Sequence, residues 1–562
     1  MSKRLKLGKD DPKYLYLFLL FWLSFSYITN YFIEVNGEEA YYWIFGQYPS
    51  WGYLDHPPVI GWLTALGYQI LPNALGLRFF MPLLSVGIIF LIWEITNRKN
   101  TKFLVWMCLG LAPLHAASYL VKTDVPLLFF LLLFFYGYKR YLKSDDLKSI
   151  LIITISIAGV MLSKYHGFLV VLFVVLSNLT LLKKKSFWFI VGLVTLLMIP
   201  HLMWQIEHDF ITFKFHLYGR KDLGFKWESV VYFFLVQPLV FGPLIGVILF
   251  YVFIKENAKN LFDRALKFAG YGVFIFFFYL SFRVEFHKHW TSVIGVPLVI
   301  FTFRYISNNP RLEKLTIKLS QISFALLVLA KIYLSYDFLP NSLTKDWDKI
   351  HGWESWATEV KELSGGLPVI FESNYERASR YYYLTGQTTH SYNRATYRET
   401  EHDLLPLESE LIGKKVFWIN RTDDPLKYTS YMTDFGKEVQ YRIVEDFQSF
   451  RRVKIELEKV EISKNKLSGE LRLLNKTDRI VDFDTRSGRE VSVVAHFLKG
   501  NSQLGAVSLV PVTGQMSPGE VIELVIDLEL PKEHQEIDLS FSLKVQDLPA
   551  PINSFKYHLE YD

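Results

Sequence analysis

Long apolar segments recur along the first 335 residues, and short segments of alternating polarity follow them. A helix needs ~20 mostly apolar residues to cross the hydrocarbon core of a bilayer. The pattern therefore predicts a polytopic α-helical membrane protein with about eleven transmembrane helices. The predicted spans lie near residues 14–33, 77–96, 103–120, 125–142, 149–163, 167–182, 187–204, 229–254, 265–282, 291–306 and 317–335.

The C-terminal part has the pattern of a water-exposed protein, and it suggests two modules. Residues 337–450 mix helix and strand: 353–363 has helical spacing, and 375–385 predicts a helix that ends at Gly386. Residues 451–562 alternate apolar and polar positions in short runs separated by turn residues, which is typical of a β-sandwich. The expected domains are a membrane domain, an α/β module and a β-sandwich, over residues 1–336, 337–450 and 451–562.

The basic residues indicate how the membrane domain is oriented. Cytoplasmic loops carry an excess of Lys and Arg. If the N-terminus is cytoplasmic, every strongly basic loop falls on the same side, and an odd number of spans places residues 337–562 outside. We therefore expect a multi-pass membrane protein with a cytoplasmic N-terminus and extracytoplasmic C-terminal modules. The basic loops are residues 97–102, 139–148, 182–186, 255–267 and 308–318.

Composition excludes several other classes of function. The chain contains one cysteine, Cys108, which lies in an apolar segment, so neither a disulfide framework nor a cysteine-based zinc site is expected. The net charge of +6 is spread over the basic loops and forms no continuous stripe. Nucleic acid is therefore not an expected partner.

The loops expected outside the membrane are rich in residues that can do chemistry. The first of them, residues 35–58, places Glu38, Glu39, Asp55 and His56 among seven Phe, Tyr and Trp residues. Other loops of the same side add further acids, lysines, arginines and histidines. A site for an anionic, lipid-attached substrate needs cations for the phosphate and a carboxylate for proton transfer or metal binding. These loops are residues 121–124, 163–167, 205–228 and 283–290.

Four segments resemble one family. "EEAYYWIFGQYPSWGYLDHPPVIGWL" (38–63) is similar to the first outer loop of bacterial GT-C membrane glycosyltransferases, the group related to protein O-mannosyltransferases and to the lipid A aminoarabinose transferase. "KTDVPLLFF" (122–130), "HDFITFKFHLYGR" (208–220) and "GLPVIFESNYERASRYYYLTGQ" (366–387) resemble other parts of these proteins. The resemblance implies transfer of one sugar from a polyprenyl phosphate to an acceptor, with inversion at the anomeric carbon. It also implies that the protein lies in the inner membrane of a bacterium and acts on the outer side of that membrane.

The resemblance also implies roles for individual residues. Glu38 takes the place of the family's catalytic Asp, and Asp124 that of a second acid, with Glu39 as a further catalytic candidate. Asp55 and His216 match a metal-binding pair of the lipid A relative, which makes a divalent metal the one cofactor considered. Cations near the same face are generic candidates for binding the donor phosphate. These cations are Lys164, Arg220, Arg283 and Lys288.

Each acid also has a structural interpretation. Asn36 and Glu39 have the spacing of a helix capping box, and Asp124 can stabilise the first turn of a helix. Asp55 can stabilise the turn before two prolines, and His216 can mark the membrane interface. Glu38 departs from the family's usual Asp, and an extra methylene moves the carboxylate by ~1 Å, enough to affect rate.

Two other classes of function remain open from the sequence: a transporter or flippase for a lipid-linked glycan, and an inactive glycan-binding scaffold. Transporters place charges near the bilayer midplane and often contain inverted repeats. Here the charges lie at one face and no repeat is visible, which favours an enzyme. The expected partners are the lipid-linked sugar, membrane lipids and an acceptor: lipid A or another lipopolysaccharide sugar, a surface glycan, or a protein Ser or Thr.

Overall fold

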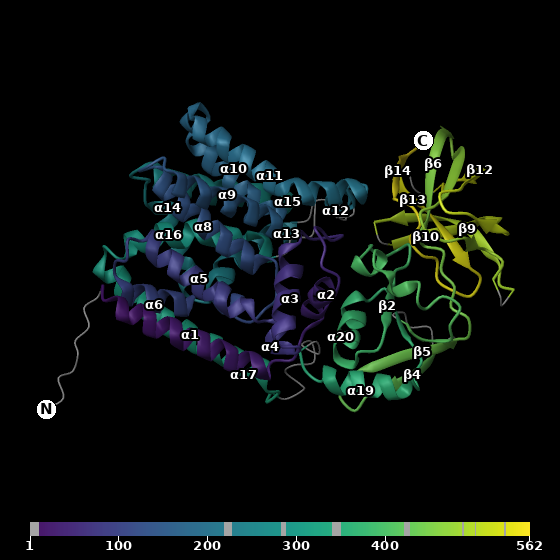
Figure 1. The fold of residues 1–562 in the computed structure, drawn as a ribbon, viewed down its shortest axis with the longest axis horizontal. Coiled ribbons are helices and arrows are strands. Elements are labelled where there is room, and N and C mark those ends of the chain that lie inside the picture. Colours follow the sequence, from purple (N-terminus) through teal and green to yellow (C-terminus); the bar gives the residue numbers. More distant parts are fainter. Residues whose placement is uncertain are drawn as a thin grey trace. The chain divides into compact units, whose positions relative to one another are not determined.

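The structure is a computed structural model that forms two compact units, Met1–His351 and Gly352–Asp562, each described here by itself (Figure 1). The described residues are 10–218, 227–282, 288–339, 350–420, 428–485, 488–500, 502–532 and 536–561.

The first unit is helical throughout its described parts. Short 3-10 helices at Tyr165–Gly167 (η1), Leu179–Lys183 (η2) and Lys288–Ile294 (η3) join some of its α-helices. The α-helices are α1 (Pro12–Phe32), α2 (Gly37–Gln47), α3 (Val59–Ile70), α4 (Ala74–Leu77), α5 (Phe80–Ile95), α6 (Thr101–Gly110), α7 (Ala112–Ala117), α8 (Asp124–Tyr141), α9 (Leu147–Ser163), α10 (Phe168–Ser177), α11 (Lys185–Glu207), α12 (Ile211–Tyr218), α13 (Trp227–Phe241), α14 (Ile245–Lys255), α15 (Leu261–Leu280), α16 (Gly295–Ile306) and α17 (Pro310–Ser335).

The apolar segments of the sequence fall on helices, but their lengths vary. Within the described residues, four helical segments are long and apolar enough to cross a membrane, and a bent pair makes a fifth. The other predicted spans coincide with shorter or more polar helices, so the structure does not reproduce eleven full-length spans. The four segments are Pro12–Phe32, Ala74–Ile95, Lys185–Glu207 and Pro310–Ser335.

The bent pair occupies the single span predicted over residues 229–254 and shows that this segment is not one straight helix. α13 and α14 meet at an angle of 107° at the break between them. Pro238 interrupts the hydrogen bonding of α13, and Pro243 lies in the break itself. A Cβ on Gly246 would lie 1.8 Å from the carbonyl oxygen of Pro238, so only glycine permits this close approach.

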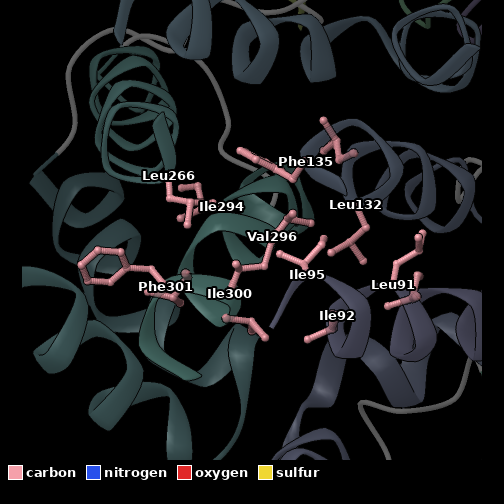
Figure 2. Close-up of a cluster of buried hydrophobic side chains, with 14 of the residues drawn as sticks. Leu91, Ile92, Ile95, Leu132, Phe135, Leu266, Ile294, Val296, Ile300 and Phe301 are labelled. Carbon is pink, nitrogen blue, oxygen red and sulfur yellow. The ribbon is translucent and has the colours of Figure 1, made fainter. Parts of the chain in front are cut away.

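A continuous apolar core holds the helices of the first unit together. Figure 2 shows side chains of α5, α8, α15 and α16, with η3, gathered in one cluster of buried residues. Ile92 of α5, Leu132 of α8 and Ile300 of α16 are almost completely shielded from solvent. This packing fixes η3 and the start of α8, which both contribute to the site described below.

The second unit begins with an α/β arrangement that agrees with the sequence prediction. α19 (Trp353–Leu363) and α20 (Tyr375–Thr385) accompany a five-stranded sheet of order β2-β1-β3-β5-β4. α20 ends at Gly386, whose φ of 68° lies in the left-handed region that favours glycine, which confirms the predicted helix end. The strands are β1 (Val369–Glu372), β2 (Thr389–Tyr392), β3 (Val416–Ile419), β4 (Thr429–Met432) and β5 (Glu438–Val444).

The remainder of this unit is the expected β-sandwich. A four-stranded sheet, β10-β9-β13-β14, and a three-stranded sheet, β12-β7-β6, are both antiparallel, and β8 pairs with β11. One buried cluster includes Trp418 of the first sheet and Leu471 and Leu539 of the sandwich, so a single core joins the two predicted modules. The strands are β6 (Val453–Ser463), β7 (Lys466–Asn475), β8 (Val481–Asp482), β9 (Val491–Lys499), β10 (Ser502–Pro511), β11 (Gln515–Met516), β12 (Val521–Glu529), β13 (Glu536–Val545) and β14 (Tyr557–Glu560).

Candidate active site

The helix α2 presents two adjacent glutamates in its first turn, and its cap distinguishes them. The Asn36 side chain accepts a hydrogen bond from the backbone N–H of Glu39 at 3.1 Å. In return, the Glu39 carboxylate accepts from the backbone N–H of Asn36 at 3.1 Å. This reciprocal pair is the capping box that the sequence predicted.

Glu39 is also held by a buried arginine. Arg78 donates to both carboxylate oxygens, at 2.9 and 2.7 Å, and the exposed fractions of the Arg78 and Glu39 side chains are 0% and 1%. The backbone N–H of Val121 donates a further hydrogen bond to this carboxylate at 3.2 Å. These contacts favour a structural role for Glu39, in which it fixes the start of α2 against the residues that precede α8.

Glu38 points away from this buried pair. Its carboxylate lies 2.8 Å from the ammonium of Lys122, and the Glu38 side chain is 41% exposed. Partial burial raises the pKa of Glu38, but the charge of Lys122, with smaller contributions from His289 and His56, outweighs burial and holds the pKa below its ordinary value. Glu38 is therefore an ionised and accessible carboxylate near neutral pH.

Asp124 forms a second carboxylate–lysine pair. It is the first residue of α8, and Lys164, which follows α9, donates to its Oδ2 atom at 2.9 Å. The Ser292 hydroxyl donates to the other oxygen at 3.0 Å. The side chains of Asp124 and Lys164 are only 13% and 11% exposed, so this pair is more enclosed than the pair at Glu38.

His289 links the two pairs. It belongs to η3 and interacts electrostatically with Glu38 and Lys122 as well as with Asp124 and Lys164. The site thus brings together α2, the residues before α8, the end of α9 and η3, which are far apart in the sequence. Two carboxylates and two ammonium groups around one imidazole can accept a proton and stabilise a phosphate.

Polar contacts fasten the first loop beside this site. His201 of α11 interacts through Nδ1 with the carbonyl oxygen of Trp51 at 2.6 Å, and its Nε2 lies 3.0 Å from the hydroxyl of Tyr165. Thr212 of α12 donates to the carbonyl of Tyr53 at 2.9 Å. The aromatic residues between positions 41 and 53 are mostly buried, whereas Trp51 is 46% exposed. Most of the aromatic stretch therefore forms the core of the loop.

The predicted metal pair is in contact, but through the backbone. His216 Nε2 lies 3.2 Å from the carbonyl oxygen of Asp55, and the Asp55 residue is 5% exposed. Within the described ranges, no group of three acidic or histidine side chains suited to a metal includes Asp55 or His216. Two ligands do not by themselves make a metal site, so the divalent metal stays a prediction.

Comparison with known proteins identifies relatives of this arrangement. A family model described as dolichyl-phosphate-mannose-protein mannosyltransferase matches residues 55–204. The lipid A galacturonosyltransferase RgtD of Rhizobium johnstonii is 22% identical over 416 residues, which cover 69% of this chain and 86% of the relative. The crystal structure of ArnT from Cupriavidus metallidurans, bound to undecaprenyl phosphate, is similar in fold with a TM-score of 0.54. That match has 13% identity and covers 76% of this chain and 98% of ArnT.

The chain is similar to GT-C membrane glycosyltransferases in sequence and in fold. The matches confirm the resemblance drawn from the sequence and the expected fold, a membrane protein with a C-terminal β module. They also support an enzyme that transfers a sugar. They do not bear on individual site residues, whose roles rest on the geometry above.

Several of the predicted phosphate-binding residues fall outside the described residues. Arg220 and Arg283 lie there, as does the side chain of Lys288, so their assignment to the donor phosphate stays a prediction. Conversely, Arg78 and Ser292 were not predicted from the sequence. Arg78 lies at the edge of an apolar segment, and Ser292 is an ordinary residue type, so neither carries a local signal of its contact with a carboxylate.

Replacing Lys122 by methionine should move the acidic limb of the pH–rate profile to higher pH. Lys122 holds the pKa of Glu38 below its ordinary value, so its removal raises that pKa. A base acts only when deprotonated, and activity is then lost at a higher pH as the pH falls. The measurement is kcat/KM against pH. Lys148→Met, which changes an exposed lysine of another loop, is the control and should leave the limb in place. An unchanged limb in Lys122→Met would contradict the pairing.

Proposed function

We propose that the chain transfers a sugar from a polyprenyl-phosphate donor to an acceptor at the outer face of a bacterial inner membrane. The observation that carries this proposal is the meeting of the pairs Glu38–Lys122 and Asp124–Lys164 around His289. The fold match to ArnT, which was crystallised with undecaprenyl phosphate, supports a lipid-linked donor. The relation to a lipid A galacturonosyltransferase favours lipid A or another lipid-linked saccharide as acceptor.

In the proposed reaction, Glu38 accepts the proton of an acceptor hydroxyl. The hydroxyl oxygen then forms a bond to the anomeric carbon of the donor sugar, and the bond from that carbon to the phosphate oxygen breaks. The polyprenyl phosphate leaves with the electron pair of that bond. Lys122 and Lys164 stabilise the negative charge on the phosphate, and an attack opposite the leaving group inverts the anomeric carbon.

Asp124 has a positioning role in this scheme. Because it is paired with Lys164 and receives the hydroxyl of Ser292, it holds the lysine in place beside the donor phosphate. Glu38 is the better base because its side chain is more exposed to an incoming acceptor. If the acceptor atom is a phosphate oxygen, no proton transfer is needed, and Glu38 then acts through its charge.

Two experiments test the proposed function. Mass spectrometry of lipid A and surface glycans from a deletion strain should show the loss of one sugar residue, restored by the wild-type gene. In the second experiment, the purified protein is mixed with polyprenyl-phosphate sugars and with the acceptor isolated from the deletion strain. The protein should add the missing sugar residue to that acceptor. Identical glycans and lipid A in the two strains would argue against the proposal.

Reporter fusions test the proposed orientation. The one-sided distribution of basic loops predicts that residues 145 and 257 are cytoplasmic and that residue 352 is outside. Alkaline phosphatase, which is active only outside the cytoplasm, should therefore be active only when fused at residue 352. A second set of fusions would carry a reporter that is active only in the cytoplasm. The orientation would be contradicted if, at residue 352, the phosphatase fusion were inactive and the cytoplasmic reporter active.

A further inference from the structure

The second unit contains a large polar cavity that the proposed reaction does not use. Its volume is about 920 Å³, which lies within the range of small-molecule sites. Strands β9, β10 and β13 of the sandwich line one side of it, through residues such as His496, Gln503 and Lys544. Arg442 of β5 and the segment around Arg394 line another side. The cavity thus lies between the outer face of a sandwich sheet and the five-stranded sheet.

His496 carries unused hydrogen-bonding groups at the wall of this cavity. The residue is 3% exposed, and neither ring nitrogen has a hydrogen-bond partner among the described residues. Its direct neighbour on β13, Ser540, is also buried and has a hydroxyl without a described partner, although Ser540 does not itself line the cavity. Burying such groups without a partner is costly, so a ligand that bonds them gains affinity.

The chemistry of this imidazole indicates the kind of ligand. Burial, with a smaller contribution from Lys544, lowers the pKa of His496 to about 4, so the ring is neutral at pH 7. A neutral imidazole has one donor and one acceptor nitrogen, and a sugar hydroxyl can serve as the partner of either. The cavity wall therefore offers a site for hydroxyl groups.

The charges on the wall favour an acidic group on the same ligand. The wall carries four cations and four acids. Arg394 pairs with Glu372, and Arg489 lies 3.6 Å from Asp446. A third acid, Glu445, pairs with Lys415, which is not part of the wall, so Asp547 is the one acid of the wall without an ion pair among the described residues. Arg442 instead donates to a backbone carbonyl at 2.9 Å. In the described part of the chain, no carboxylate forms an ion pair with Arg442 or with Lys544, so two unpaired cations of the wall stand against one unpaired acid.

We propose that this cavity is a binding site for a saccharide that bears a carboxylate or a phosphate. His496 bonds to its hydroxyls, and Lys544 and Arg442 hold its acidic group. Such a site would let the second unit bind the saccharide part of a surface glycan or of a glycolipid acceptor. The site does not depend on the proposed transfer reaction, because it lies wholly within the second unit.

Binding to the full-length protein in detergent tests this proposal. The probes are digalacturonate and glucose 1-phosphate as acidic saccharides, and maltose as the neutral reference. At least one acidic probe should bind more tightly than maltose. The acidic probe with the higher affinity shows whether the site prefers a carboxylate or a phosphate. Lys544→Met and His496→Leu should each weaken that binding by ~10-fold, the effect of losing a charge-assisted or buried hydrogen bond.

Matched variants separate binding from folding and from catalysis. His558→Leu and Lys466→Met change an exposed histidine and an exposed lysine of the same unit and should bind like the wild type. Glu38→Gln should also retain binding, so a failure of the proposed reaction is distinguishable from a failure of this site. Thermal unfolding shows whether the His496→Leu protein is folded. If His496→Leu does not fold, Lys544→Met provides the test, because the Lys544 side chain is partly exposed and its loss should not prevent folding. Equal affinity for the acidic probe in wild type and Lys544→Met, or no binding of either acidic probe at millimolar concentration, would overturn the proposal.

Discussion

Replacing Glu38 by glutamine should lower the rate of sugar transfer by ~10²-fold or more, a typical loss when a general base is removed. Glutamine keeps the size of the side chain but cannot accept the proton of an acceptor hydroxyl. Because Glu38 is 41% exposed and makes its ion pair with the partly exposed Lys122, the substitution should cost little stability. The measurement is turnover with saturating donor and acceptor, together with donor affinity, which should remain near the wild-type value.

Two further variants decide whether Glu38 or Asp124 is the base. Glu38→Asp keeps a carboxylate of the type usual in the family and should retain more activity than Glu38→Gln. Asp124→Asn weakens the contact with Lys164 and should give a loss between that of Glu38→Gln and the wild type. Wild-type turnover in Glu38→Gln with an inactive Asp124→Asn would assign the base to Asp124. Full activity in both would exclude the carboxylate mechanism.

The local elements of the fold were predictable because their signals are local. The capping box at Asn36 and Glu39 and the glycine that ends α20 at Gly386 are short patterns with one physical meaning each. The length of the spans and the 107° bend between α13 and α14 were not predicted. An apolar sequence predicts only that the segment is buried in the protein or lies in lipid. The bend, in contrast, depends on how Pro238 packs against Gly246.

The candidate site was likewise predictable only where its signals are local. Glu38 and Asp124 were found because each occurs in a motif of adjacent residues. Their partners were harder to find, since the lysine of Asp124 lies 40 positions away and the arginine of Glu39 lies 39 positions away. Which acid is catalytic and which is structural therefore depends on tertiary contacts that the spacing of residues does not encode.

Removing Arg78 should destabilise the first unit by ~3–5 kcal/mol, the usual cost of leaving one partner of a buried ion pair uncompensated. Arg78 donates five hydrogen bonds: two to Glu39, and one each to the backbone carbonyls of Asn30, Ile33 and Glu34. It thereby joins the end of α1 to the start of α2. In Arg78→Met, the Glu39 carboxylate stays buried without its cation, and these carbonyls lose their donor. Thermal and denaturant unfolding of the purified protein in detergent should show a large loss of stability.

Comparing the stability of Arg78→Met with that of Glu39→Gln and Lys122→Met makes this prediction specific. Glu39→Gln retains a side chain that can complete the capping box and accept one hydrogen bond from Arg78, so it should cost less than Arg78→Met. Lys122→Met breaks the partly exposed pair with Glu38, and such pairs contribute only ~0–1 kcal/mol. The expected order of destabilisation is thus Arg78→Met, then Glu39→Gln, then Lys122→Met. If Arg78→Met were no less stable than Lys122→Met, the buried pair would not be what fixes α2, and Glu39 would again be a candidate for the chemistry.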